Sequence, residues 1–198
     1  MAVPQKVLDS VYGSKPGDWK QHENGGGWVY KTAIVEKSVY LHPSSLVYGN
    51  ARVYGDAWVY GNARVYGDAR VYGDAWVYGN ARVYGDAWVY GDAWVYGDAR
   101  VYGDARVYGD ARVYGDAWVT SPPYIQGTKH ALTLCSLTQI AVGCHIHDIP
   151  DWLKRYRAIG RAEGYTKEQI AEYGLHLAHL ATLAKKLQAT AKKAAKTK

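Results

Sequence analysis

The sequence predicts an all-β solenoid, a parallel β-helix of triangular coils that is capped by a C-terminal α-helical hairpin. Two observations predict the solenoid. An aliphatic residue recurs every six residues from Val29 to Val119, and most of these units continue with Tyr and then Gly-Asp or Gly-Asn, a turn signal. Beyond Ile149 the apolar spacing becomes that of amphipathic helices, which predicts the hairpin.

Each six-residue unit is expected to form a short strand and a corner. In the stretch VYGNARVYGDAR the Val and the Ala two positions before it point to the same side, because side chains alternate along a strand. The Gly supplies a corner position that needs positive φ. Three strands and three corners make a coil of 18 residues, so the sixteen units predict a little over five coils with a Val and Ala interior. Such an interior explains 19 Tyr and 8 Trp but no Phe.

The flanking segments complete the predicted domain organisation. Residues 1–26 are expected to form an irregular N-terminal cap, and residues 27–148 the β-helix with a loop insertion at about 121–131. After this loop the six-residue pattern is expected to resume with Leu134, Ile140 and Ile146. In that phase Cys144 points inward and Cys135 outward, so no disulfide is expected.

Residues 149–190 predict the helical hairpin, and residues 191–198 a Lys-rich tail. The first helix carries Trp152, Tyr156 and Ile159 on one face and ends at Gly164. In the second, Thr166 and Gln169 have the spacing of a capping box. Its apolar stripe consists of Ile170, Tyr173, Leu177, Leu180, Ala184 and Leu187.

The repeat resembles a known family. The pattern of an aliphatic residue, a two-residue corner and a small residue is similar to the hexapeptide repeat of left-handed parallel β-helices, familiar from acyltransferases. More closely, VYGNARVYGDAW followed by IAVGCHIHDIPDW and a helical tail resembles uncharacterised phage and prophage hexapeptide-repeat proteins, many of them labelled acyl- or acetyltransferases. The resemblance implies a left-handed β-helix, and β-helices of this type commonly form homotrimers. It is specific for fold and weak for activity.

The outward Arg or Trp before each aliphatic residue sorts into three columns with a period of 18. The first column reads Trp28, Leu46, Arg64, Arg82, Arg100 and Trp118; the second reads Ile34, Arg52, Arg70, Trp88, Arg106 and Tyr124; the third reads Tyr40, Trp58, Trp76, Trp94 and Arg112. The third column lies beside Tyr60, Tyr78, Tyr96 and Tyr114.

These columns are the candidate binding surfaces. Trp58, Trp76 and Trp94 with their tyrosines predict a homotrimer interface or a stacking platform for sugars or bases. The alternative is a purely structural ladder of stacked rings. The ladder Arg64, Arg82 and Arg100 joins the candidate binding residues.

The corner Asp residues stack as well. Asp56, Asp74, Asp92 and Asp110 are expected on one edge, where they either form corners or line a cation-binding edge. We expect corner structure there.

His145 and His147 are the candidate catalytic residues. They flank Ile146 on one strand, next to Asp148, and three interpretations stand: a structural junction, a metal site, or a general base for acyl transfer. In the transferase alternative, acetyl-CoA is the cofactor and the 121–131 loop lies at the acceptor site. Otherwise we expect no cofactor and no metal. His176 and His179, one turn apart on the last helix, are expected to be surface residues.

The net charge of +6 is unevenly distributed. Residues 27–119 hold nine Lys or Arg against ten Asp or Glu, whereas residues 120–198 hold twelve against five. We therefore expect no nucleic-acid binding, except through the Lys-rich tail, whose other interpretation is a solubilising segment.

Neither a signal peptide nor a membrane span is expected. A cytoplasmic location follows, in the bacterial host if a phage encodes the chain. The predicted function is a phage- or prophage-type binding or scaffold protein for an unidentified protein or small ligand, and the alternative is an acyltransferase.

Overall fold

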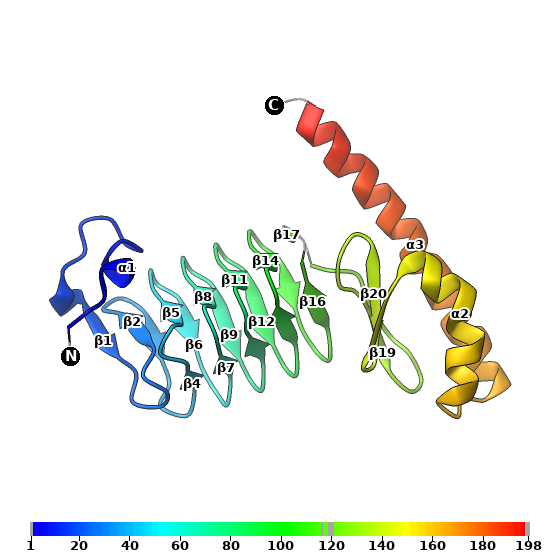
Figure 1. The fold of residues 1–198 in the computed structure, drawn as a ribbon, viewed down its shortest axis with the longest axis horizontal. Coiled ribbons are helices and arrows are strands. Elements are labelled where there is room, and N and C mark those ends of the chain that lie inside the picture. The colour runs from blue at the N-terminus through cyan, green and yellow to red at the C-terminus, as the bar shows by residue number, and fades with distance from the viewer. Residues whose placement is uncertain (1, 116, 119–120, 197–198) are drawn as a thin grey trace. The chain divides into compact units, whose positions relative to one another are not determined.

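The computed structural model describes residues 2–115, 117–118 and 121–196 (Figure 1). The chain divides into two compact units. The solenoid unit comprises residues 1–110 and 114–121, and the C-terminal unit comprises residues 111–113 and 122–198. Among the described residues, helices long and apolar enough to cross a membrane are absent.

The solenoid unit is a parallel β-solenoid of about five coils, as the repeat predicts. Strands 18 residues apart pair in register, for example Arg64 with Arg82 and Val65 with Val83. The first sheet runs β1 (Trp19–Gln21), β2 (Trp28–Tyr30), β5 (Leu46–Val47), β8 (Arg64–Val65), β11 (Arg82–Val83), β14 (Arg100–Val101) and β17 (Ala117–Trp118). The second runs β3 (Ile34–Val35), β6 (Arg52–Val53), β9 (Arg70–Tyr72), β12 (Trp88–Tyr90) and β15 (Arg106–Val107). The third contains β4 (Tyr40–Leu41), β7 (Trp58–Val59), β10 (Trp76–Val77) and β13 (Trp94–Tyr96). The division between the units falls in β16 (Arg112–Tyr114).

The interior of the coils is a column of small aliphatic side chains. The inward Val residues from Val47 to Val101 and the inward Ala residues from Ala51 to Ala105 have no exposed surface. The corners depend on glycine, because twelve corner glycines from Gly49 to Gly115 have φ between +58° and +81°. A Cβ on Gly67 would lie 2.9 Å from the backbone nitrogen of Gly85 in the next coil. Both the backbone conformation and the distance between coils therefore exclude other residues.

The N-terminal segment is more regular than expected. It contains α1 (Gln5–Leu8), a 3₁₀ turn (Pro16–Asp18) and β1, which pairs antiparallel with β2. Val7 and Trp19 pack with Trp28 and Leu46, each of which is 4% exposed. The first two members of the first column thus point out of the coil, as predicted, but lie buried under the cap.

The register changes at the last coil. The predicted column places Trp118 beside Arg100, but Ala117 pairs with Arg100 and Trp118 with Val101. That part of the prediction is wrong by one residue. The final aliphatic of the repeat, Val119, lies outside the described residues.

The prediction that the coil resumes after residue 131 is wrong. Residues 124–148 form an antiparallel sheet in the order β18 (Tyr124–Gln126), β19 (Ala131–Leu134), β20 (Gln139–Val142) and β21 (His145–Asp148). The stretch has no Gly-Asp or Gly-Asn corner, so its strands reverse direction instead. Tyr124 consequently belongs to this sheet and not to the second column. The predicted orientation of the two cysteines is also reversed: Cys135 is buried and Cys144 is exposed.

The helical hairpin is present as expected, with α2 (Ile149–Ala162) and α3 (Lys167–Lys196). The capping box forms, because the Gln169 amide nitrogen donates to Thr166 Oγ1 and the Thr166 amide nitrogen donates to Gln169 Oε1. The predicted stripe of α3 faces the interior of the C-terminal unit, with Tyr173, Leu177 and Leu180 buried. Indole Nε1 of the buried Trp152 on α2 donates to the Ile140 carbonyl at 2.7 Å.

Candidate functional site

The third sheet of the solenoid unit carries the predicted tryptophan column, which we call the Trp face (Trp58, Trp76 and Trp94 with Tyr60 and Tyr78). The tryptophans pair in register, with ring centroids 5.1 and 5.4 Å apart. The five rings line an apolar groove of about 340 Å³. Trp58 and Trp76 leave 40% and 36% of their surface exposed. Tyr96 extends this face, since its ring stacks on Tyr78 at 5.0 Å.

The ring spacing on the Trp face favours some ligands over others. Trp58 and Trp76 are nearly parallel, with an interplanar angle of 6°. A further ring between them would need about 7 Å, because each carbon-to-carbon contact takes roughly 3.5 Å. The indole faces therefore cover one another and present their edges outward. This geometry suits contact with a flat apolar surface better than stacking of bases or sugars between the rings.

The first sheet carries the predicted arginine ladder, which we call the Arg face (Arg64, Arg82 and Arg100). The three residues pair in register on β8, β11 and β14. Guanidinium groups about 5 Å apart repel by roughly 0.8 kcal/mol per pair in water. Among the ion pairs of the described residues, none includes one of these arginines.

A tyrosine ladder runs beside the arginines. Its ring centroids are 4.7–5.0 Å apart with interplanar angles of 2–5°. Burial raises the pKa of the hydroxyls of Tyr48 and Tyr66. The members of this ladder are Tyr48, Tyr66, Tyr84 and Tyr102.

The second sheet interleaves the two residue types, and we call it the mixed face (Arg52, Arg70, Trp88 and Arg106). The guanidinium carbons of Arg70 and Arg106 lie 4.7 and 5.2 Å from the Trp88 ring, on neighbouring strands. These cation–π contacts stabilise the arginines within the molecule. The same hexapeptide position thus has three different environments on the three faces.

The corner residues form ladders along the edges. On the edge between the Trp and Arg faces, Asn62 Nδ2 donates to Asn80 Oδ1 at 3.3 Å and Asn80 Nδ2 donates to Asp98 Oδ1 at 3.1 Å. The edge between the mixed and Trp faces consists entirely of Asp, namely Asp56, Asp74, Asp92 and Asp110. Within the described ranges, groups of three or more His, Cys, Asp or Glu that are arranged to hold a metal ion are absent.

His145 and His147 share one face of β21, as predicted, with ring centroids 6.1 Å apart. That face is covered by α2, so both rings are half-buried, and His147 meets the edge of Trp152 at 5.0 Å. His145 Nε2 lies 3.0 Å from Glu163 Oε1. An imidazole paired with a carboxylate can act as a general base. The sequence did not indicate Glu163 as the partner of His145.

The cavity next to this pair is small. Its volume is about 30 Å³, enough for about one water molecule, and its lining is almost wholly apolar. Val142, Trp152, Ile159 and Leu177 contribute to the lining. Tyr165 also lines it, and burial raises the pKa of its hydroxyl. The cavity has no space for an acyl group and its acceptor, so the pair lacks an adjoining substrate site.

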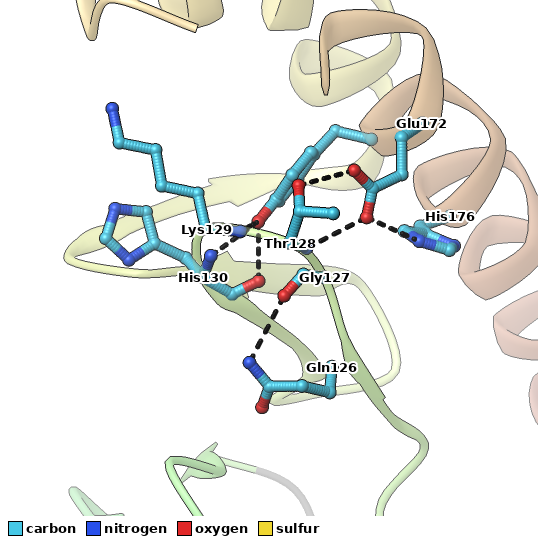
Figure 2. Close-up of polar contacts among 8 residues, drawn as sticks. Gln126, Gly127, Thr128, Lys129, His130, Glu172 and His176 are labelled. Atoms are coloured by element: carbon cyan, nitrogen blue, oxygen red, sulfur yellow. Dashed lines mark hydrogen bonds and ion pairs between the residues drawn. The ribbon is translucent and has the colours of Figure 1, made fainter. Parts of the chain in front are cut away.

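The predicted loop at residues 121–131 is mostly β-strand, and its central turn is held by α3 (Figure 2). The hydroxyl of Tyr173 accepts hydrogen bonds from the amides of Lys129 and His130 and donates to the His130 carbonyl at 2.7 Å. Glu172 accepts from the Thr128 amide at 2.9 Å and from Thr128 Oγ1 at 2.6 Å. A turn with this many contacts to a helix has a structural role. The apolar spacing of α3 predicted that Tyr173 is buried, but not the contacts of its hydroxyl.

The remaining candidates lie on α3. His176 Nε2 is 3.4 Å from Glu172 Oε1, so this histidine belongs to the contact that holds the turn (Figure 2). His179 is exposed, as expected of a surface residue. The side chains of the predicted Lys-rich tail, residues 191–198, lie outside the described residues.

Comparison with known families identifies the repeat. Residues 47–61, 59–73, 63–79, 75–91, 93–107 and 105–120 match a family model described as YdcK Beta solenoid repeat. The chain is therefore a β-solenoid repeat protein. Curated proteins and solved structures contain no match to the chain. The resemblance to hexapeptide-repeat and phage proteins stays a prediction.

Proposed function

We propose that the chain is a binding scaffold of the phage or prophage type, in which the solenoid holds the Trp face rigid for contact with other copies of the chain in a homotrimer. The observation that carries this proposal is the groove of Trp58, Trp76 and Trp94. Stacked, partly exposed tryptophans form a contiguous apolar surface, and large apolar surfaces on folded proteins mark interaction sites. Trp is also enriched at the centres of interfaces.

The solenoid suits this role because it separates folding from recognition. Val, Ala and Gly build the coil and leave the outward Arg or Trp free to vary, and the mixed face shows Arg and Trp on neighbouring strands of one sheet. A surface residue can therefore change without a change of fold. The pre-formed face also avoids an ordering cost on association.

The test is the mass in solution, measured by light scattering, of the unchanged chain and of two variants. We expect a trimer for the unchanged chain and a smaller species for Trp76→Arg, which places a charge in the middle of the Trp face. Trp88→Arg is the matched control, with the same substitution on the mixed face, and should leave the trimer intact.

Two results would contradict the proposal. A monomeric unchanged chain would contradict the trimer, and equal dissociation of both variants would contradict the assignment to the Trp face. Binding of acetyl-CoA by the unchanged chain, with loss of binding in His145→Ala, would favour the transferase alternative instead.

A further inference from the structure

The first sheet changes character where the N-terminal cap ends. Trp28 and Leu46 are buried against Val7 and Trp19 of the cap. The next residues in the same column are Arg64, which is half-buried, and Arg82, which is exposed. The residue type at each position of this column therefore follows what covers it. The arginines belong to the part of the sheet that the cap leaves open.

On this open part, positive charge accumulates without compensation from within the chain. On the mixed face the arginines are separated by Trp88, which contacts two of them. On the Arg face three arginines follow one another, and within the described ranges their guanidinium groups form no ion pairs. Repulsion along such a ladder is relieved by a ligand that brings negative charges at a similar repeat.

The surface beside the ladder is built for anions as well. A polar groove of about 380 Å³ is lined by Arg64 and Arg82 together with Lys6 of α1. Its edge consists of Asn62 and Asn80, where the edge between the mixed and Trp faces has Asp at every corner. Asp98 is the one carboxylate among the lining residues described, against three cations. Neutral amides at this edge keep the groove positive.

The geometry also distinguishes between kinds of polyanion. The tyrosines beside the arginines stack face to face at 4.7–5.0 Å, so their ring faces are covered. Nucleic-acid bases, which bind single-strand sites by stacking on open aromatic rings, find no open face along this ladder. Hydroxyl, amide and guanidinium groups along the groove suit a polymer rich in hydroxyl and acid groups.

We propose that the Arg face binds an acidic polysaccharide that lies along the solenoid axis, with its carboxylate or sulfate groups on Arg64, Arg82 and Arg100. Guanidinium groups bind such anions through paired hydrogen bonds. Asn62 and Asn80 contact the sugar hydroxyls. This site adds a ligand to the proposed scaffold and uses a different face from the self-association.

The test is a calorimetric titration of the full chain with a heparin oligosaccharide, a defined sulfated polysaccharide. Arg82→Trp is compared with Arg106→Trp: both lose the same charge, and both place Trp at a position where the repeat itself uses it. We expect Arg82→Trp to weaken binding roughly tenfold or more, and Arg106→Trp to stay within about twofold of the unchanged chain.

Three outcomes would overturn the inference. Absence of heparin binding would reject an anion site, and equal weakening by both variants would mean that net charge alone attracts the polymer. Tighter binding of a single-stranded oligonucleotide with the same number of charges would reject the polysaccharide as occupant. The variant Trp76→Arg should keep full heparin affinity, so failure of the trimer and failure of this site are distinguishable.

Discussion

The two units of the chain use their residues in different ways. In the solenoid unit one contact is repeated many times: each corner glycine meets the glycine of the next coil, and each Val meets the next Val. In the C-terminal unit single residues make contacts that occur once, such as the three hydrogen bonds of the Tyr173 hydroxyl. Repetition therefore leaves outward positions free for recognition, whereas the C-terminal unit depends on individual side chains.

The largest effect should come from a corner glycine. Gly67→Ala places a Cβ 2.9 Å from the Gly85 nitrogen at a φ of +72°, and we expect a loss of about 3 kcal/mol in local stability. The measurement is hydrogen exchange of the Asp68 amide, which donates to the Gly85 carbonyl at 3.0 Å.

Gly164→Ala in the C-terminal unit is the control for this contact. Gly164 has a similar φ, +68°, but nothing lies within 4 Å of an added Cβ. We expect about 1 kcal/mol there, from the backbone conformation alone. An equal loss at both sites would show that the packing of coil on coil contributes nothing.

Removal of one hydroxyl should separate the two units next. Tyr173→Phe leaves the amides of Lys129 and His130 without their acceptor, and we expect a loss of about 2 kcal/mol in the local stability of the turn. Tyr84→Phe is the same change in the solenoid unit, where the ring stacks between Tyr66 and Tyr102. Hydrogen exchange should detect almost no effect of this second variant, and a similar loss in both would contradict the contrast.

Acid should affect the turn by a smaller amount. Hydrogen bonds from the Thr128 side chain lower the pKa of Glu172. A depressed pKa means that this contact stabilises the fold above the unfolded value, about 4.3, and that the stabilisation is lost as the pH falls through the folded pKa. Protection of the Thr128 amide should thus decrease between about pH 5 and pH 3.

Glu172→Gln should remove this pH dependence. The protonated form of His176, 3.4 Å away, pairs with Glu172 as long as the carboxylate stays ionised, so the loss should follow the carboxylate. Protection that is constant over this pH range in the unchanged chain would contradict the assignment.

The solenoid could be predicted almost completely from the sequence because each of its determinants repeats. Val, Ala and Gly recur at fixed positions, and the 18-residue register placed Trp58, Trp76 and Trp94 on neighbouring strands. The first failure lies at the cap. Nothing in the letters of residues 1–26 shows that Val7 folds back over Trp28 and Leu46.

The antiparallel sheet was missed for a specific reason. Leu134, Ile140 and Ile146 keep a spacing of six, but here the spacing arises from four-residue strands joined by reversing turns. Gly143, with φ of +54°, is followed by Cys144 and forms a two-residue hairpin turn. The informative signal was the absence of Gly-Asp and Gly-Asn after the repeat. The neutral Asn edge beside the Arg face could have been found by sorting the corner residues with the same 18-residue period.

The pairing of strands 18 residues apart has a consequence for how such a gene can change. A deletion or duplication of one hexapeptide unit preserves every Val, Ala and Gly contact, so the coil survives. It nevertheless rotates all later residues to the next face and would break the Trp and Arg columns at that point. Changes of 18 residues keep the faces and alter their length. The repeat thus tolerates copying errors in the coil, while selection on its surfaces would retain those that come in whole turns.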